Sequence, residues 1–164
     1  MDGFLDAASG SYDFSRDAAQ RRMLQEAKVR GATLFEAFAN SPPYWMTVSG
    51  CASGGAGGAE NLSSSSYQAF ATYLATVVKH FHDVEGITFE SLEAFNEPDG
   101  GWWGSYGSQE GFVAPIATQN AVLPLVAAAL TTAGLPTFVA VLPRALLNIE
   151  RCSGRHGRYA TSRI

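Results

Sequence analysis

The sequence has little charge and almost no cysteine. Charged residues make up 16% of its 164 residues, against roughly 25% in an ordinary soluble domain, and Cys51 and Cys152 are the two cysteines. Two cysteines permit at most one intramolecular disulfide, and their separation does not match a metal-binding motif, so we predict no metal site. The chain also begins without a basic n-region or an apolar h-region, and no secretory signal peptide is visible.

Long apolar runs are absent as well. The longest candidate, residues 121–130, is broken by Pro124 and falls short of the roughly 18 residues of a membrane span, so we expect no membrane span. The net charge of −4 argues against a nucleic-acid partner, because such binding needs clustered Lys and Arg. Hydrophobic residues nevertheless reach 46%, which is enough for a core. The length fits one domain but excludes a complete (β/α)₈ barrel of about 250 residues.

Charge divides the chain into two unequal parts. Residues 1–142 contain six Lys and Arg against fourteen Asp and Glu, whereas residues 143–164 contain five Arg against one acidic residue, Glu150. No apolar periodicity is present from Arg151 onward. We therefore expect a folded domain over residues 1–142 and a basic, disordered tail over residues 143–164.

Hydrophobic periodicity predicts alternating helices and strands. The clearest stripe runs from Tyr67 to Phe81, where apolar residues recur at steps of three and four, and it predicts a helix. Similar patterns predict helices over 16–30 and 114–133, and strands over 33–39, 87–95 and 137–142. One helix separates each pair of strands, which is the βαβαβ pattern of an α/β fold with a parallel sheet and right-handed crossovers.

Polar and aromatic residues gather after two of the predicted strands. Residues 40–46 read Asn-Ser-Pro-Pro-Tyr-Trp-Met, and residues 96–103 read Asn-Glu-Pro-Asp-Gly-Gly-Trp-Trp. In parallel α/β folds, functional groups collect at the carboxyl ends of the strands. A carboxylate beside an amide and among Trp and Tyr suits the binding of a sugar ring and the protonation of its glycosidic oxygen.

These two segments, together with Gln109-Glu110-Gly111, resemble glycoside hydrolase family 30, most closely its fungal endo-β-1,6-galactanase-like members. The resemblance covers roughly residues 12–141. It implies a retaining hydrolase with a (β/α)₈ barrel, of which this chain holds a partial barrel of about strands 3–5 with the intervening helices. It also implies a galactan polysaccharide or oligosaccharide substrate, no cofactor and an extracellular location.

The resemblance assigns roles to single residues. Glu97, in Asn-Glu-Pro at the end of the fourth barrel strand, is expected to be the general acid/base, and Asn96 to bind the hydroxyl next to the anomeric carbon. In this family the nucleophile follows the seventh strand, so the truncated chain by itself is expected to be inactive. The other residues expected near the substrate are Asn40, Tyr44, Trp45, Trp102, Trp103 and, in the barrel interior, Glu36.

Two alternatives stay open. Asn-Glu-Pro identifies the chemistry better than the sugar, so another family 30 specificity, such as glucosylceramidase or xylanase, fits the same residues. The alternative outside the enzymes is a non-catalytic fragment that at most binds sugar through its aromatic residues. Beyond residue 141 the resemblance ends, and the Arg-rich composition suits an altered reading frame or an unspliced intron. Ordinary structural roles are expected for Glu90, Glu93, Asp99 and Glu110.

Overall fold

The computed structural model describes residues 3–7, 9–140 and 159–163, the last five by their backbone alone. The helices are α1 (Ala18–Val29), α2 (Tyr67–Asp83) and α3 (Ile116–Thr132), and the strands are β1 (Leu34–Phe38), β2 (Ser91–Glu93), β3 (Phe138–Ala140) and β4 (Tyr159–Arg163). Short 3-10 turns lie in the connections at Tyr44–Met46, Ala56–Gly58 and Ser64–Ser66. Within this described part, no helix is long and apolar enough to cross a lipid bilayer.

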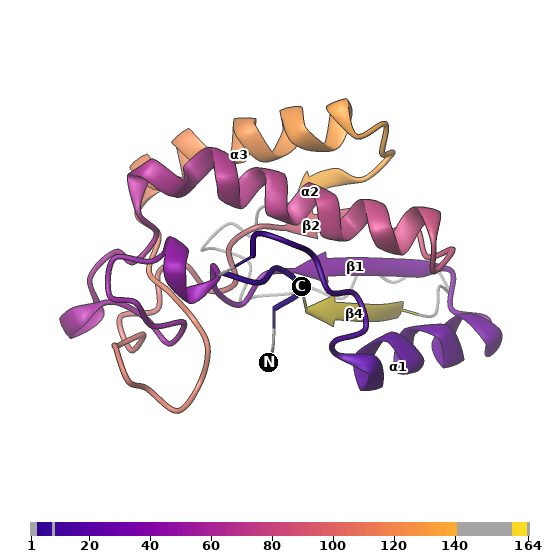
Figure 1. Cartoon of the computed structure of the whole chain (residues 1–164), viewed down its shortest axis with the longest axis horizontal. Helices are drawn as coiled ribbons and strands as arrows, with labels where there is room; N and C mark the ends of the chain where they lie inside the picture. The colour runs from indigo at the N-terminus through magenta and orange to yellow at the C-terminus, as the bar shows by residue number, and fades with distance from the viewer. Residues whose placement is uncertain (1–2, 8, 141–158, 164) are drawn as a thin grey trace, which may run out of the picture.

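The strands form one parallel sheet in the order β3-β2-β1-β4 (Figure 1). Glu36 on β1 lies opposite Ser91 on β2, and Ser91 lies opposite Phe138 on β3. Because α2 connects β1 to β2 and α3 connects β2 to β3, the predicted βαβαβ order is confirmed. All strands point the same way, so their carboxyl ends share one edge, and the loops that follow β1 and β2 project there (Figure 1).

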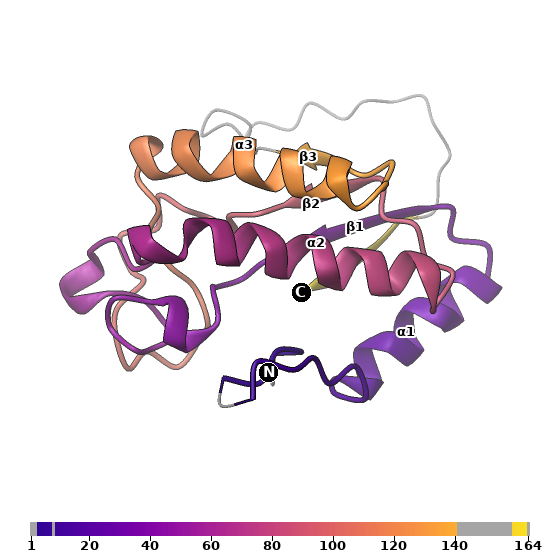
Figure 2. The same cartoon turned by 45° about the horizontal axis from the view of Figure 1, so that its top comes forward.

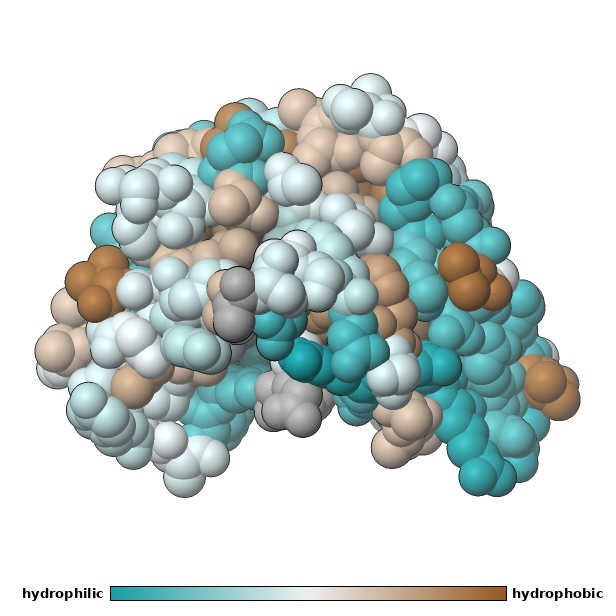
Figure 3. Space-filling model, viewed as in Figure 1, coloured by the Kyte–Doolittle hydropathy of each residue, from teal (hydrophilic) through white to brown (hydrophobic). Residues whose placement is uncertain are grey.

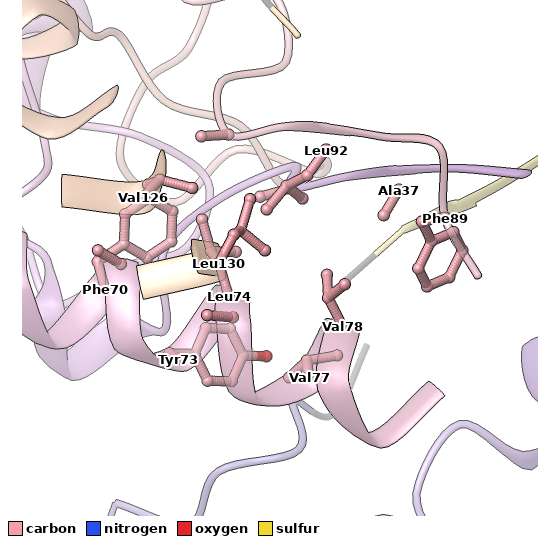
Figure 4. Close-up of a cluster of buried hydrophobic side chains, with 14 of the residues drawn as sticks. Ala37, Phe70, Tyr73, Leu74, Val77, Val78, Phe89, Leu92, Val126 and Leu130 are labelled. Carbon is pink, nitrogen blue, oxygen red and sulfur yellow. The ribbon is translucent and has the colours of Figure 1, made fainter. Parts of the chain in front are cut away.

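Helices α2 and α3 lie side by side over one face of this sheet (Figure 2). The apolar stripe of α2 forms its buried side, where Phe70, Leu74 and Val78 are fully buried. Ala37 and Leu92 of the sheet belong to the same core cluster (Figure 4). Burial of each large apolar side chain contributes about 1.5–3 kcal/mol. This core holds the strands, and therefore the residues at their ends, in place.

Helix α1 is attached to the end of α2 by polar contacts. Arg21 Nε donates to Glu85 Oε1 over 2.9 Å, and Gln25 Nε2 donates to the Glu85 carbonyl over 2.8 Å. Hydrophilic side chains dominate the surface over α1 (Figure 3). The helix begins at Ala18, two residues later than predicted, because Asp17 has a left-handed backbone with φ 51°.

The strands are shorter than the apolar pattern predicted. β2 occupies residues 91–93 of the predicted 87–95, although Ile87 and Phe89 before it are buried. Burial produces the apolar pattern, whereas a strand exists only where main-chain groups pair with a neighbour. Residues 141–142 of the third predicted strand lie outside the described residues.

The expected tail lies mostly outside the described residues, which omit 141–158. Residues 159–163, however, form β4, which pairs in parallel with β1 so that Phe38 lies opposite Arg163. We had not predicted a strand there. An open strand edge pairs through main-chain groups with an extended segment of almost any sequence, so no apolar alternation marked this strand.

The other face of the sheet carries Glu36, Phe38, Ser91 and Glu93, which alternate with the residues that face the helices, and of these four Ser91 and Glu93 are themselves buried. Phe138 shares this face through its register with Ser91, and it is 56% exposed. In a closed (β/α)₈ barrel, side chains on this face fill the interior and pack against the opposite strands. We call these residues the open face of the sheet.

Candidate active site at the strand ends

The two predicted motifs meet at the carboxyl edge of the sheet. Asn40 follows β1 and Asn96 follows β2, and Asn96 Nδ2 donates a hydrogen bond to Asn40 Oδ1 over 3.2 Å. Adjacent parallel strands bring their ends to neighbouring positions, so residues distant in the sequence become neighbours here. Glu97 comes directly after Asn96 and is exposed. This contact therefore places an amide pair beside a solvent-accessible carboxylate.

The backbone of Glu97 is held in an unusual conformation. Its φ of 49° lies in the left-handed region, which costs a residue with a Cβ about 1–3 kcal/mol. The Glu97 carbonyl accepts hydrogen bonds from Gly100 N at 2.9 Å and from Trp103 Nε1 at 3.0 Å. These two bonds fix the turn after β2, and strain of this kind at a non-glycine residue is typical of functional sites.

The two neighbouring tryptophans have different environments. Trp102 is 70% exposed, whereas Trp103 is 4% exposed. A Cβ on Gly54 would lie 2.6 Å from the Trp103 carbonyl carbon, and a Cβ on Gly111 would lie 2.4 Å from the Trp103 ring. Glycine is therefore needed at both positions for the loops to close around Trp103. Its position supports the Glu97 turn, and Trp102 is the one of the pair that is accessible to a ligand.

Three carboxyl groups lie near one another: those of Glu36 and Glu93 on the open face, and that of Glu97 beyond the carboxyl end of β2. Ser91 Oγ donates to Glu36 Oε1 over 2.9 Å, which holds the Glu36 side chain on the open face, and the interior role that the resemblance implied for Glu36 stays a prediction. Glu93 is only 7% exposed, and its buried Oε1 has no hydrogen-bond partner in the described residues. Burial, together with the charges of Glu36 and Glu97, raises the pKa of Glu93 from 4.5 to about 7.

The loop after β1 contributes the aromatic part of the site. Tyr44 is exposed, Trp45 is half-buried, and their rings meet edge to face with centroids 5.0 Å apart. Both residues line a cavity of about 200 Å³, together with Asn40 and residues of the N-terminal segment. The structure thus brings Asn40, Tyr44 and Trp45 to one hollow, while Trp102 lies outside its lining.

No metal centre is evident in the described part of the chain, which contains no group of three or more His, Cys, Asp or Glu side chains arranged to hold an ion. His82 Nδ1 lies 3.0 Å from Thr88 Oγ1, and His80 Nε2 lies 3.7 Å from Glu85 Oε1. Cys51 is a free thiol in the glycine-rich loop. Each of these groups is accounted for by local structure.

Two residues of the site were not predicted from the sequence. Glu93 was expected to be an ordinary strand-end charge, but it is buried beside two other carboxyl groups. Asp17 was not singled out, yet it lines the cavity with a strained backbone. Alternation along β2 would have placed Glu93 on the same face as Ser91, but its neighbours depend on β1, about 55 residues away in the sequence. Nothing in the sequence signals the backbone conformation of Asp17.

The described fold is α/β, with parallel strands that alternate with helices in an open sheet, as in part of a (β/α)₈ barrel. The sequence model of O-Glycosyl hydrolase family 30 matches residues 1–158. The chain therefore belongs to this family. The match also extends past residue 142, where we expected the family-like domain to end.

Individual relatives agree with this membership. An endo-β-1,6-galactanase of Hypocrea rufa is 42% identical over 146 residues, covering 85% of this chain and 30% of that protein. An exo-β-1,6-galactobiohydrolase of Bifidobacterium longum subsp. longum is 39% identical over 104 residues, covering 58% of this chain and 6% of that protein. A crystal structure of a conserved exported protein from Bacteroides fragilis superposes with a TM-score of 0.78 at 29% identity, covering 85% of this chain and 28% of that one. The chain thus spans about a third or less of the length of these relatives.

Proposed function

We propose that this chain is the part of a β-1,6-galactan hydrolase that carries the general acid/base, Glu97. The observation that supports this role most directly is the position of the Glu97 carboxyl. It is exposed at the carboxyl end of β2, next to the Asn96–Asn40 amide pair, on a turn fixed by Trp103 and Gly100. A proton donor must reach the glycosidic oxygen, and a rigid turn fixes the backbone position from which the Glu97 side chain extends toward it.

In the proposed reaction, a carboxylate from the remainder of the barrel attacks the anomeric carbon while the bond to the glycosidic oxygen breaks. Glu97 gives its proton to that oxygen, so the leaving sugar departs as a neutral alcohol. Glu97 then takes a proton from water as the water attacks the glycosyl-enzyme bond, which releases the second sugar and restores both carboxyl groups. The stereochemistry at the anomeric carbon is retained after the two displacements.

Asn96 is proposed to hold the hydroxyl next to the anomeric carbon. An amide carries two N–H donors and one carbonyl acceptor. The bond to Asn40 occupies one donor of Asn96 and leaves the other donor and the carbonyl for a ligand. This bond also restricts the Asn96 side chain to one orientation, so less conformational entropy is lost when substrate binds.

The substrate assignment rests on the relatives. Two of them are named for β-1,6-linked galactose, one cleaving within the chain and one releasing galactobiose. We propose β-1,6-galactan as the substrate class and, since the structural neighbour is described as exported, an extracellular site of action. Glucosylceramide and xylan are the competing substrates within the family, and a non-catalytic sugar-binding fragment is the competing role.

A chimera tests the function with this chain's own residues. The part of this chain that aligns with the Hypocrea rufa galactanase, 85% of its length, replaces the aligned segment of that protein, which supplies the rest of the barrel. We expect the chimera to release reducing sugar from β-1,6-galactan, and Glu97→Gln to lower its turnover by about 10²–10⁴-fold. Glycosylation by a substrate with an activated leaving group should be less affected, because that group departs without a proton.

Glu90→Gln is the matched control, because Glu90 is an exposed carboxylate at the opposite end of β2. It should leave turnover unchanged. A chimera that folds but cleaves xylan or a glucosylceramide in place of galactan would overturn the substrate assignment. Equal loss on both kinds of leaving group after Glu97→Gln would remove Glu97 from the acid role.

A further inference from the structure

The cavity beside Asn40 has a second wall that the proposed mechanism does not use. One wall is the loop after β1, from Asn40 to Trp45. The other wall comes from the N-terminal segment around Phe4 and from Arg16 and Asp17 at the start of α1. The cavity is therefore lined by these two walls, which are more than twenty residues apart in the sequence, and also by Ala52, Tyr73 and Glu110.

Arg16 fixes the position of the N-terminal wall. Its Nη1 donates to the Gly3 carbonyl over 2.8 Å, and its guanidinium pairs with Asp13 at 3.3 Å and with Asp6 at 3.6 Å. A guanidinium has five N–H donors in a planar arrangement, and here it joins both ends of the segment from Gly3 to Asp13. The contacts of Arg16 therefore hold the N-terminal wall in place.

Asp17 differs from Arg16 because its side chain has no hydrogen-bond or ion-pair partner among the described residues. It is the N-cap residue of α1, but its carboxylate makes no capping hydrogen bond. It forms no ion pair or side-chain hydrogen bond with any described residue, and it lines the cavity. Its φ of 51° and ψ of 41° are strained for a residue with a Cβ. The chain therefore tolerates strain at Asp17 without a contact in the fold that would compensate for it.

On the opposite wall, the amide of Asn40 supplies hydrogen-bond donors that complement the acceptor oxygens of Asp17. It is 4% exposed, and its Oδ1 is taken by Asn96. Its Nδ2 donates to no described residue, although Asn40 lines the cavity. An amide N–H that reaches the cavity can donate to water or to a ligand there. Asn40 is also hydrogen-bonded to Asn96, the residue directly before Glu97.

We propose that this cavity is a subsite for one neutral sugar unit of the substrate, and that Asp17 determines its specificity. A sugar hydroxyl both donates and accepts, so a hydroxyl pair can donate to the Asp17 carboxylate while a neighbouring oxygen accepts from Asn40 Nδ2. Trp45 provides an apolar ring beside them. The acidic residues Asp17 and Glu110 on the lining disfavour anionic ligands. The inference rests on the proposed function for the identity of the sugar.

Saturation-transfer difference NMR with β-1,6-galactobiose and the 164-residue chain tests the subsite. The key variant is Asp17→Gly, because glycine adopts φ 51° without strain and only the carboxylate is lost. We expect this variant to unfold at a higher denaturant concentration than the wild type, and to bind galactobiose at least about tenfold more weakly, as expected when a charged hydrogen-bonding group is removed. Improved stability combined with weaker binding separates ligand recognition from a structural role.

Tyr106→Gly is the matched control. Tyr106 also has a positive φ, 62°, but it is 88% exposed and absent from the cavity lining. It should gain stability and keep the affinity of the wild type. Equal affinity of Asp17→Gly and wild type, or absence of binding by the wild type at millimolar galactobiose, would overturn the proposal. Binding is measured without turnover, so the outcome is independent of whether the chimera hydrolyses galactan.

Discussion

Asn96 and Asn40 are 56 residues apart in the sequence and share a hydrogen bond of 3.2 Å between their side-chain amides. The bond joins the end of β2 to the end of β1, and so joins the Asn-Glu-Pro turn to the aromatic loop. The bond restricts the orientation of both side-chain amides. The proposed acid/base and the proposed sugar subsite are therefore parts of one polar unit.

The isolated 164-residue chain should not hydrolyse β-1,6-galactan. Retaining cleavage needs two carboxyl groups about 5–5.5 Å apart, one of which attacks the anomeric carbon. Glu97 is proposed to donate the proton, and the family places the attacking group on a later strand. The measurement is release of reducing sugar by a purified preparation free of host glycosidases. Release that disappears in Glu97→Gln would contradict this expectation and assign the second role to a carboxyl group within the chain.

Glu93 should make stability decrease with increasing pH. Its pKa is about 7 in the folded chain against an ordinary 4.5, so between these values the folded chain binds more proton than the unfolded chain. The free energy of unfolding therefore falls as pH rises from about 4.5 to 7, and this contribution is constant above that range. Urea unfolding at several pH values measures the slope.

Glu93→Gln should remove that part of the slope and stabilise the chain above pH 7. The glutamine keeps the shape and has no charge to bury beside Glu36 and Glu97. The exposed Glu90→Gln serves as the control and should keep the slope of the wild type. An unchanged slope in Glu93→Gln would show that another group causes the pH dependence.

Trp103→Phe should destabilise the chain by about 1–3 kcal/mol. The substitution removes the indole N–H that donates to the Glu97 carbonyl and leaves that carbonyl with one bond fewer. Trp102→Phe at the exposed neighbouring position should change stability by no more than about 0.5 kcal/mol. Chemical denaturation of both variants gives the comparison, and equal effects would mean that the indole bond does not support the turn.

Gly54→Ala should cost more than about 2 kcal/mol. Its φ is 133°, and the added Cβ would lie 2.6 Å from the backbone of Trp103, which cannot move without displacing the Glu97 turn. Gly101→Ala is the control in the same region, because nothing lies within 4 Å of its Cβ position. Thermal melts of the two variants should differ clearly, and similar melting temperatures would refute the close packing of the glycine-rich loop on Trp103.

The open face should promote self-association. Phe138 is exposed on this face and lies on β3, at one end of the sheet order in the described chain. Unpaired strand edges and exposed apolar side chains favour contacts between copies. Phe138→Lys should therefore reduce oligomers in sizing chromatography and lower the binding of the dye ANS. The wild type as a monodisperse monomer without dye binding would contradict this prediction.

The sequence predicted the helices better than the site. Apolar residues from Tyr67 to Phe81 form one stripe, and α2 occupies this stretch. Local hydrophobic periodicity is enough to predict such a helix. Glu93 illustrates the limit. Its pKa depends on burial and on Glu36 and Glu97, and these contacts exist only after β1 and β2 pair.

The backbone of Asp17 and the strand β4 were also beyond sequence reasoning. Asp is common at helix N-caps with ordinary backbone angles, so its left-handed conformation has no sequence signal. β4 pairs through main-chain groups that every residue carries. The apolar pattern placed Asn96 and Glu97 after the second predicted strand, and they do lie beyond the end of β2 at Glu93, whereas the roles that the family resemblance gives them stay predictions.

The parallel pairing of β4 with β1 has a practical consequence for handling this protein. Arg163 lies opposite Phe38, so the last described residues point toward the edge that carries the candidate site, and Gly3 near the other terminus lines the cavity. An affinity tag or fluorescent fusion at either terminus would thus be attached beside the proposed sugar-binding groups. The exposed turn at Gly134, between α3 and β3 at the opposite edge, is the better place to insert a purification epitope.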